Sequence, residues 1–173
     1  MSKIGWGKPR IIVKNITKAG SFRELPTPVE DTFDVSTEKG DKLEAKIEGG
    51  DYEDVRYKKN GMTITMDIRV AKGRKKPFND VDGVIQDEFE LYVVPEDPTV
   101  PAGLHVQRAC VSAELKDTAA DGMTYTYTIE PLKPASGKTV EVGTVTVTES
   151  SGLISACSIV ELAAETDEES SSN

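Results

Sequence analysis

Residues 60–70 read Asn-Gly-Met-Thr-Ile-Thr-Met-Asp-Ile-Arg-Val and contain the clearest fold signal of the chain. After the Asn60-Gly61 dipeptide, apolar and polar residues alternate without interruption up to Val70. Side chains on a strand point alternately to opposite faces, so this segment has one face for a core and one for solvent. The segment is therefore predicted to be an antiparallel β-strand that follows a tight turn.

Alternation of the same kind recurs along the chain, and no comparable helical stretch separates the repeats. Gly-Gly, Asn-Gly and Asp-Gly dipeptides stand between several of these stretches and indicate turns. The predicted strands are residues 10–16, 42–48, 52–58, 62–70, 88–94, 104–115, 123–130, 139–148 and 153–162, with a short extended piece at 32–35.

Pairing is predicted where two strands follow each other across a short turn. The segments 42–48, 52–58 and 62–70 are therefore expected to form a three-stranded meander. In the next-to-last strand the apolar phase slips around Gly143, which predicts a bulge or a sharp bend. A last hairpin is expected to turn at residues 150–152.

These patterns predict a mainly β fold, an antiparallel β-sandwich or barrel with at most one or two short helices and long loops. One short helix is compatible with the sequence near residues 78–84. A chain of 173 residues suits one domain with a substantial core. We predict a single β domain over residues 1–164, followed at 165–173 by an acidic, serine-rich tail that is too polar to pack and is expected to be disordered.

Charge excludes some functions. The chain has 30 acidic and 21 basic residues and a net charge of −9, so it repels phosphate backbones and is not expected to bind nucleic acid without sequence preference. No apolar leader and no run of the roughly 20 apolar residues that a membrane helix needs are found, so no membrane partner is expected. Cys110 and Cys157 lie far apart without C-x-x-C spacing, and free thiols are favoured over one disulfide.

No constellation of residues points to catalysis. His105 is the only histidine, and with two cysteines it cannot complete a four-ligand zinc site. The acidic run at residues 79–83 fails as a calcium loop, because Phe89 stands where the twelfth-position carboxylate is required. The acidic cluster at residues 51–54 suits a solvated turn as well as acid–base chemistry. We therefore predict no enzyme, with no catalytic residue, no cofactor and no metal.

The segment 71–87 is long for a compact domain, and such segments often contact a partner. Basic residues come first and acidic residues follow, which offers salt-sensitive contacts to a neighbouring subunit. The basic part could also hold an anion, but the neighbouring acids and the lack of an aromatic platform disfavour nucleic acid. The candidate inter-subunit contacts are Lys72, Arg74, Lys75, Lys76, Asp80 and Asp82.

Several stretches resemble phage and prophage major tail tube proteins. They are Ile4-Gly5-Trp6-Gly7-Lys8-Pro9 and Leu25-Pro26-Thr27-Pro28-Val29-Glu30-Asp31-Thr32, then residues 39–50, and finally Asp121-Gly122-Met123-Thr124-Tyr125 through Pro131-Leu132-Lys133-Pro134. These stretches are distributed over residues 4–148. The acidic extension beyond Leu162 departs from a bare tube subunit.

The resemblance implies a small β-sandwich or barrel that assembles as hexameric rings, which stack into a tube for DNA or an effector. Related tubes occur in contractile injection machines and type VI secretion. It also implies that the protein associates with copies of itself and with other tail proteins, and that DNA passes through a lumen without specific binding. The protein would be assembled in the bacterial host cytoplasm and be part of the virion tail. The alternative is an Ig-like or carbohydrate-binding sandwich that acts as a phage decoration or adhesion protein.

Overall fold

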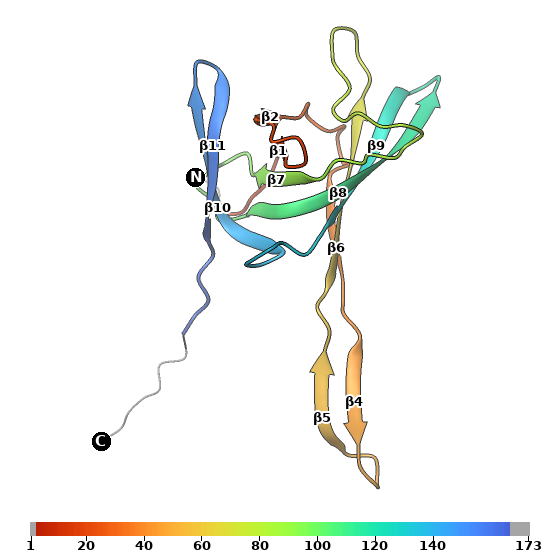
Figure 1. Ribbon diagram of the computed structural model, residues 1–173, viewed down its shortest axis with the longest axis vertical. Helices are drawn as coiled ribbons and strands as arrows, with labels where there is room; N and C mark the ends of the chain where they lie inside the picture. The colour runs from red at the N-terminus through yellow and green to blue at the C-terminus, as the bar shows by residue number, and fades with distance from the viewer. Residues whose placement is uncertain (1–2, 167–173) are drawn as a thin grey trace, which may run out of the picture. The chain divides into compact units, whose positions relative to one another are not determined.

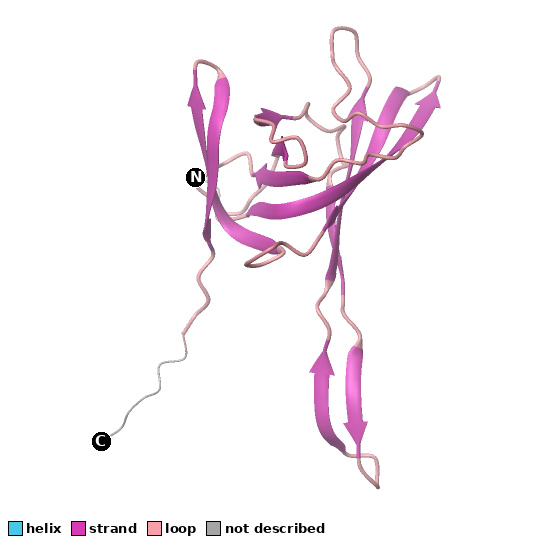
Figure 2. Ribbon diagram, viewed as in Figure 1, coloured by secondary structure: helices cyan, strands magenta, loops and turns pink. Residues whose placement is uncertain are grey.

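The computed structural model describes residues 3–166, and these form strands, turns and loops without a helix. Figure 2 shows this all-β character, and the predicted mainly β, antiparallel fold is confirmed. Accordingly, within this range no helix could cross a membrane. The strands are β1 Arg10–Asn15, β2 Phe22–Glu24, β3 Asp34–Glu38, β4 Lys42–Lys46, β5 Tyr52–Tyr57, β6 Gly61–Arg69, β7 Phe89–Val94, β8 Gly103–Thr118, β9 Gly122–Pro131, β10 Val140–Ser150 and β11 Leu153–Glu161.

The described chain divides into two compact units. Unit 1 contains residues 3–27, 89–108 and 133–166, and unit 2 contains residues 28–88 and 109–132. Strand β8 contributes its first part to unit 1 and its second part to unit 2. The single domain over 1–164 stays a prediction, and most of the predicted disordered tail lies outside the described residues.

Unit 1 is an antiparallel sheet with the strand order β2-β1-β7-β8-β10-β11 (Figure 1). The sheet curls, because β11 lies against β2 and β10 lies against β7. One core cluster joins Ile12, Tyr92, Val94 and Val145. In β1 three consecutive residues are buried, which shows that this strand is covered on both faces.

Gly143 lies where β10 changes partners, since it pairs with β8 through Gly103 and with β11 through Glu161. A Cβ atom on Gly143 would come within 1.9 Å of the Val160 carbonyl oxygen, so the phase slip seen in the sequence marks a close backbone approach. The register irregularity of β10 lies elsewhere, between Thr148 and Glu149.

The last predicted hairpin is confirmed. Ser150 pairs with Leu153, and the two residues between them have positive φ angles of 53° at Ser151 and 77° at Gly152. Positive φ at both central residues is the geometry that matches the twist of a two-residue hairpin.

Unit 2 is built on an antiparallel sheet with the order β8-β9-β6-β3. The alternating segment 62–70 forms most of its inner strand β6, in which Ile64, Met66 and Ile68 are buried while the residues between them are half-buried. Tyr127 and Ile129 of the neighbouring strand β9 join the same core. The predicted alternation is thus confirmed for residues 64–68, whereas Met62 is half-buried and Val70 lies beyond the strand and is exposed.

The predicted three-stranded meander is wrong. Strands β4 and β5 pair with each other in a separate two-stranded sheet, and β6 pairs with β3 and β9 instead of β5. The Asn60 side chain accepts a hydrogen bond from the Gly40 amide at 2.9 Å and so ties together the two chain segments that lead to the hairpin. Asn-Gly therefore does not close a turn between β5 and β6 here.

Candidate functional site

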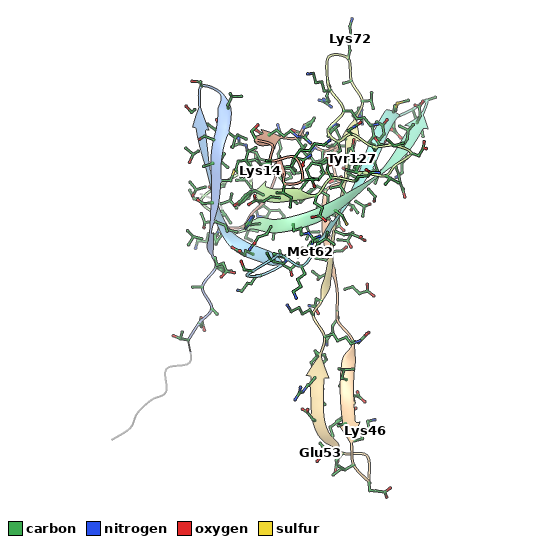
Figure 3. All side chains as sticks on the ribbon, in the orientation of Figure 1. Lys14, Lys46, Glu53, Met62, Lys72 and Tyr127 are labelled. Carbon is green, nitrogen blue, oxygen red and sulfur yellow. The ribbon has the colours of Figure 1, made fainter. Side chains whose placement is uncertain are left out.

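The predicted contact residues lie in unit 2, in the segment between β6 and β7. Residues 69–76 are exposed along their whole length and include five basic side chains without an acid among them. Figure 3 shows Lys72 at the end of this loop. Arg74 donates from Nη1 to the Arg69 carbonyl oxygen at 2.9 Å, which folds the start of the loop back on the end of β6. We call residues 69–76 the basic loop.

The second half of the segment is anchored in the core of unit 2. Phe78 is 1% exposed, and its ring packs edge-to-face on Tyr127 with a centroid distance of 5.0 Å. Ile85 is also buried, and the Gly83 carbonyl accepts a hydrogen bond from the Ala113 amide at 3.0 Å. This half is therefore a fixed part of the fold.

The short helix considered near residues 78–84 is absent from the described structure. Val81 and Val84 instead exchange two backbone hydrogen bonds across a tight turn. Asp82 and Gly83 have positive φ angles of 52° and 83°, which a right-handed helix does not allow. The anchored aromatic ring and this turn chemistry together override helix formation.

Two of the predicted contacts pair with each other. Lys76 forms an ion pair with Asp80, and its ammonium lies 4.8 Å from the centroid of the Tyr125 ring. Asp80 also accepts a hydrogen bond from the Gly83 amide at 3.0 Å. The Lys76–Asp80 hydrogen bond raises the pKa of Lys76 and lowers the pKa of Asp80. This pair stabilises the turn, whereas the side chains of Lys72 and Lys75 form no ion pair within residues 3–166.

A cavity of about 250 Å³ lies between the basic loop and the adjoining ends of β6 and β9. Its lining includes Met123 and Tyr125 together with Arg69, Arg74 and Lys75. A hollow lined by both apolar and cationic side chains suits a partner segment that presents carboxylates beside an apolar side chain.

The hairpin β4–β5 in unit 2 is highly exposed, because nearly every residue of both strands faces solvent. Leu43, Ile47 and Tyr52 are each 51% exposed, and Tyr57 is 57% exposed. Two-stranded hairpins are at best marginally stable in water on their own. A hairpin that exposes this much apolar surface is a candidate for packing against another molecule.

One face of the hairpin has an internal network. Glu44 forms ion pairs with Lys42 at 2.7 Å and with Lys46 at 3.6 Å. Both ammonium groups also lie over the Tyr52 ring, at 4.3 and 5.0 Å from its centroid. The hydrogen bond between Lys42 and Glu44 raises the pKa of Lys42 and lowers that of Glu44. These contacts hold the two strands in register without covering the apolar side chains.

The turn of the hairpin is acidic. Gly49 and Gly50 have φ angles of 95° and 89°, which only glycine adopts without strain. Four acids and no base occur in residues 47–54, which we call the acidic tip. These acids are Glu48, Asp51, Glu53 and Asp54. The sequence alone indicates this acidic cluster, whereas only the tertiary structure shows that it lies at the end of a projecting hairpin.

Unit 1 contains a buried polar cluster around the single histidine. His105 is 8% exposed, stacks on Tyr92 with ring centroids 4.2 Å apart, and lies with Nε2 2.8 Å from Glu90 Oε1. Its Nδ1 is 3.8 Å from Glu141 Oε1. Tyr92 in turn donates to the Cys157 carbonyl at 3.3 Å. Within residues 3–166, the polar contacts of His105 are to the carboxylates of Glu90 and Glu141, and no hydroxyl or thiol is hydrogen-bonded to it.

Burial raises the pKa of the Cys157 thiol to about 11, and both cysteines are free, as expected. The hydrogen bond with His105 lowers the pKa of the Glu90 carboxyl below its ordinary value, against the effect of burial. No group of acidic, histidine and cysteine side chains that could hold a metal ion is found in the part of the chain that the structure describes.

We expect Glu90→Gln to make stability less dependent on pH. A carboxyl whose pKa is lower in the folded state contributes stability above its unfolded pKa of about 4.3, and this contribution is lost as the pH falls. Glu90→Gln should therefore melt below the wild type at pH 5–6, and the gap should close toward pH 3. Thermal melts across this range measure the gap, and Glu114→Gln at an exposed position is the control. A gap that stays constant with pH contradicts this account.

Comparisons with known proteins give the following. No protein-family model matches the chain, and no curated protein matches it. Among solved structures, the chain is similar to one described as the sheath/tube terminator of an extracellular contractile injection system, PVC, in the extended state, determined by cryo-EM. That alignment has a TM-score of 0.48 and 15% sequence identity, and it covers 70% of this chain and 88% of that chain.

Proposed function

We propose that the protein is a structural subunit that assembles with copies of itself into stacked, hexameric rings of a phage tail tube or a related injection tube. The exposed β4–β5 hairpin carries this proposal. It projects from unit 2 with Leu43, Ile47 and Tyr57 open to solvent, and no described part of unit 2 covers them. A second copy that packs against these side chains would remove apolar surface from water, which stabilises the assembly by roughly 25 cal/mol per Å².

Open strand edges support lateral association. Within the described residues, β3 in unit 2 pairs only with β6. In unit 1, β11 has only β10 as a hydrogen-bonded neighbour, although it also lies against β2. Unpaired edges readily add another strand, and a closed ring satisfies them by pairing neighbouring copies. The sequence resemblance to tail tube proteins points to the same use of these edges.

The charge of the chain suits a conduit. A net charge of −9 gives the subunit a repulsive interaction with DNA, so a lumen lined by such subunits would let a polyanion slide instead of binding it. In this proposal the protein works in the virion tail after assembly in the host cytoplasm, together with other tail proteins. No chemical step, cofactor or metal is part of it.

Lys72, Arg74, Lys75, Lys76, Asp80 and Asp82 remain the proposed inter-subunit contacts. Among them Lys72, Arg74 and Lys75 are exposed and form no ion pair within residues 3–166, so they are the most available to a neighbouring copy. Lys76 and Asp80 act more through the local turn that they stabilise. Asp82 is exposed beside them.

Purified protein at increasing concentration is expected to form rings or filaments in negative-stain micrographs, with matching large species in sedimentation velocity. Replacing the four basic residues at positions 72, 74, 75 and 76 with serine should weaken this assembly and leave the monomer folded. The matched control replaces the exposed Lys3, Lys18, Lys116 and Lys133 with serine. A wild type that stays monomeric throughout the series contradicts the proposal and favours the decoration or adhesion module, which a glycan panel would then test.

A further inference from the structure

The acidic tip and the basic loop are opposite in charge and belong to the same unit. Residues 47–54 contain four acids and no base, and residues 69–76 contain five bases and no acid. Every residue of both segments is exposed. Glu48, Asp51 and Glu53 form no ion pair within residues 3–166, and neither do Lys72 and Lys75. Both surfaces therefore have charge that is free to meet a partner.

The two surfaces lie at opposite ends of β6. This strand of nine residues starts beside the base of the hairpin and ends where the basic loop begins. At roughly 3.3 Å per residue it separates them by about 30 Å. Figure 3 shows the same arrangement, with Glu53 near one end of unit 2 and Lys72 at the other. The acidic tip thus cannot reach the basic loop of its own unit.

The two connecting segments at the base of the hairpin are held together. The Lys58 amide donates to the Asp41 carbonyl at 2.9 Å, and the side chains of the same two residues form an ion pair at 3.3 Å. Gly40 lies so close to the opposite segment that a Cβ atom would be 2.1 Å from the Lys58 carbonyl oxygen. These contacts keep the two connecting segments together and reduce the entropy lost when the tip binds.

The cavity under the basic loop matches the chemistry of the tip. Arg69, Arg74 and Lys75 in its lining can pair with carboxylates, and Arg can do so in a bidentate geometry. Met123 and Tyr125, which also line it, can contact an apolar side chain, and the tip offers the exposed Ile47. Charge and apolar surface are therefore complementary at the same place.

We infer that the acidic tip of one copy docks on the basic loop and its cavity in a second copy of this chain. The contact is heterologous, because different surfaces of the two copies meet, so it propagates from copy to copy in one direction. This inference rests on the proposed self-assembly and specifies the contact that stacks successive rings. It also predicts that stacking weakens with salt, since the Debye length falls from about 10 Å at 0.1 M to about 3 Å at 1 M.

Two reversed variants test the contact directly. The tip variant has Glu48→Lys, Asp51→Lys and Glu53→Lys, and the loop variant has Lys72→Glu, Arg74→Glu and Lys75→Glu. Each variant alone presents like charges at both ends, so end-to-end association should fall by about tenfold or more relative to the wild type. When the two variants are mixed, every tip meets a loop of opposite charge, and association should return. Sedimentation velocity and titration calorimetry measure it.

A third variant that has all six substitutions should associate with itself but not with the wild type, because both mixed contacts are then repulsive. The charge-matched control is Glu30→Lys, Glu114→Lys and Asp117→Lys, at exposed acids of unit 2 outside the hairpin. Circular dichroism confirms that each variant is folded.

The results separate this inference from the proposed function. If the wild type forms stacked rings and either reversed variant stacks equally well, the tip-to-loop contact is wrong while the tube function stands. If the mixed variants bind each other but no ring appears in any sample, the contact stands and the ring function is wrong. If the mixture does not associate beyond the separate variants, the contact is overturned regardless of what the wild type forms.

Discussion

Phe78→Ala is expected to lower the free energy of unfolding by about 3–5 kcal/mol, the usual cost of truncating a buried phenylalanine. The side chain is 1% exposed and packs edge-to-face on Tyr127, at an interplanar angle of 66°. It fixes the start of the ordered half of the charged segment. The substitution should therefore also loosen the turn at Asp80 and increase hydrogen exchange at the Gly83 amide.

Denaturant titration of the wild type and the variant measures this loss. Phe78→Leu fills most of the space and should lower the free energy of unfolding clearly less than Phe78→Ala does. Phe33→Ala, at a half-buried position of the same unit, is the second comparison and should also cost less. If Phe78→Ala costs no more than Phe33→Ala, the charged segment is not anchored through this ring.

Gly143→Ala is expected to destabilise unit 1 by more than about 3 kcal/mol, beyond most single substitutions. The new Cβ atom would lie 1.9 Å from the Val160 carbonyl oxygen and 2.8 Å from the Cα atom of Glu161, and both are backbone atoms that cannot rotate away. Relief requires β11 to move away from β10. Loss of hydrogen-exchange protection should therefore concentrate in β11.

Gly61→Ala is the matched control, because Gly61 also lies in a strand but a Cβ atom there meets nothing within 4 Å. It should leave stability nearly unchanged. Equal effects of the two substitutions in a denaturant titration would show that glycine flexibility, and not the contact with Val160, sets the cost at Gly143.

Most strand positions could be predicted from the sequence, because the signal is local. A strand with one buried face alternates every second residue, as in β6, and Ser150 to Leu153 carries its own turn chemistry. The short β2 was missed since three residues are too few to show a period. The helix considered near residues 78–84 is absent, and the sequence could not show this because Phe78 packs on Tyr127, a residue far away in the chain.

The candidate contacts were only partly predictable. The sequence places basic residues between positions 72 and 76, and their exposure follows from their charge. It does not show that Lys76 is engaged with Asp80, or that a cavity lies between this loop and Tyr125. Such facts depend on distances between side chains of different strands.

The sequence by itself determined the β class, most strand positions and the segregation of charge into an acidic and a basic segment, and it favoured free cysteines. Only the tertiary structure decided that β6 pairs with β3 and β9, which leaves β4–β5 as an isolated hairpin. The physical reason is that alternation specifies which face of a strand is buried but not which strand lies beside it. Pairing is chosen by packing among residues distant in the chain, and here that choice puts the acidic tip and the basic loop at opposite ends of β6.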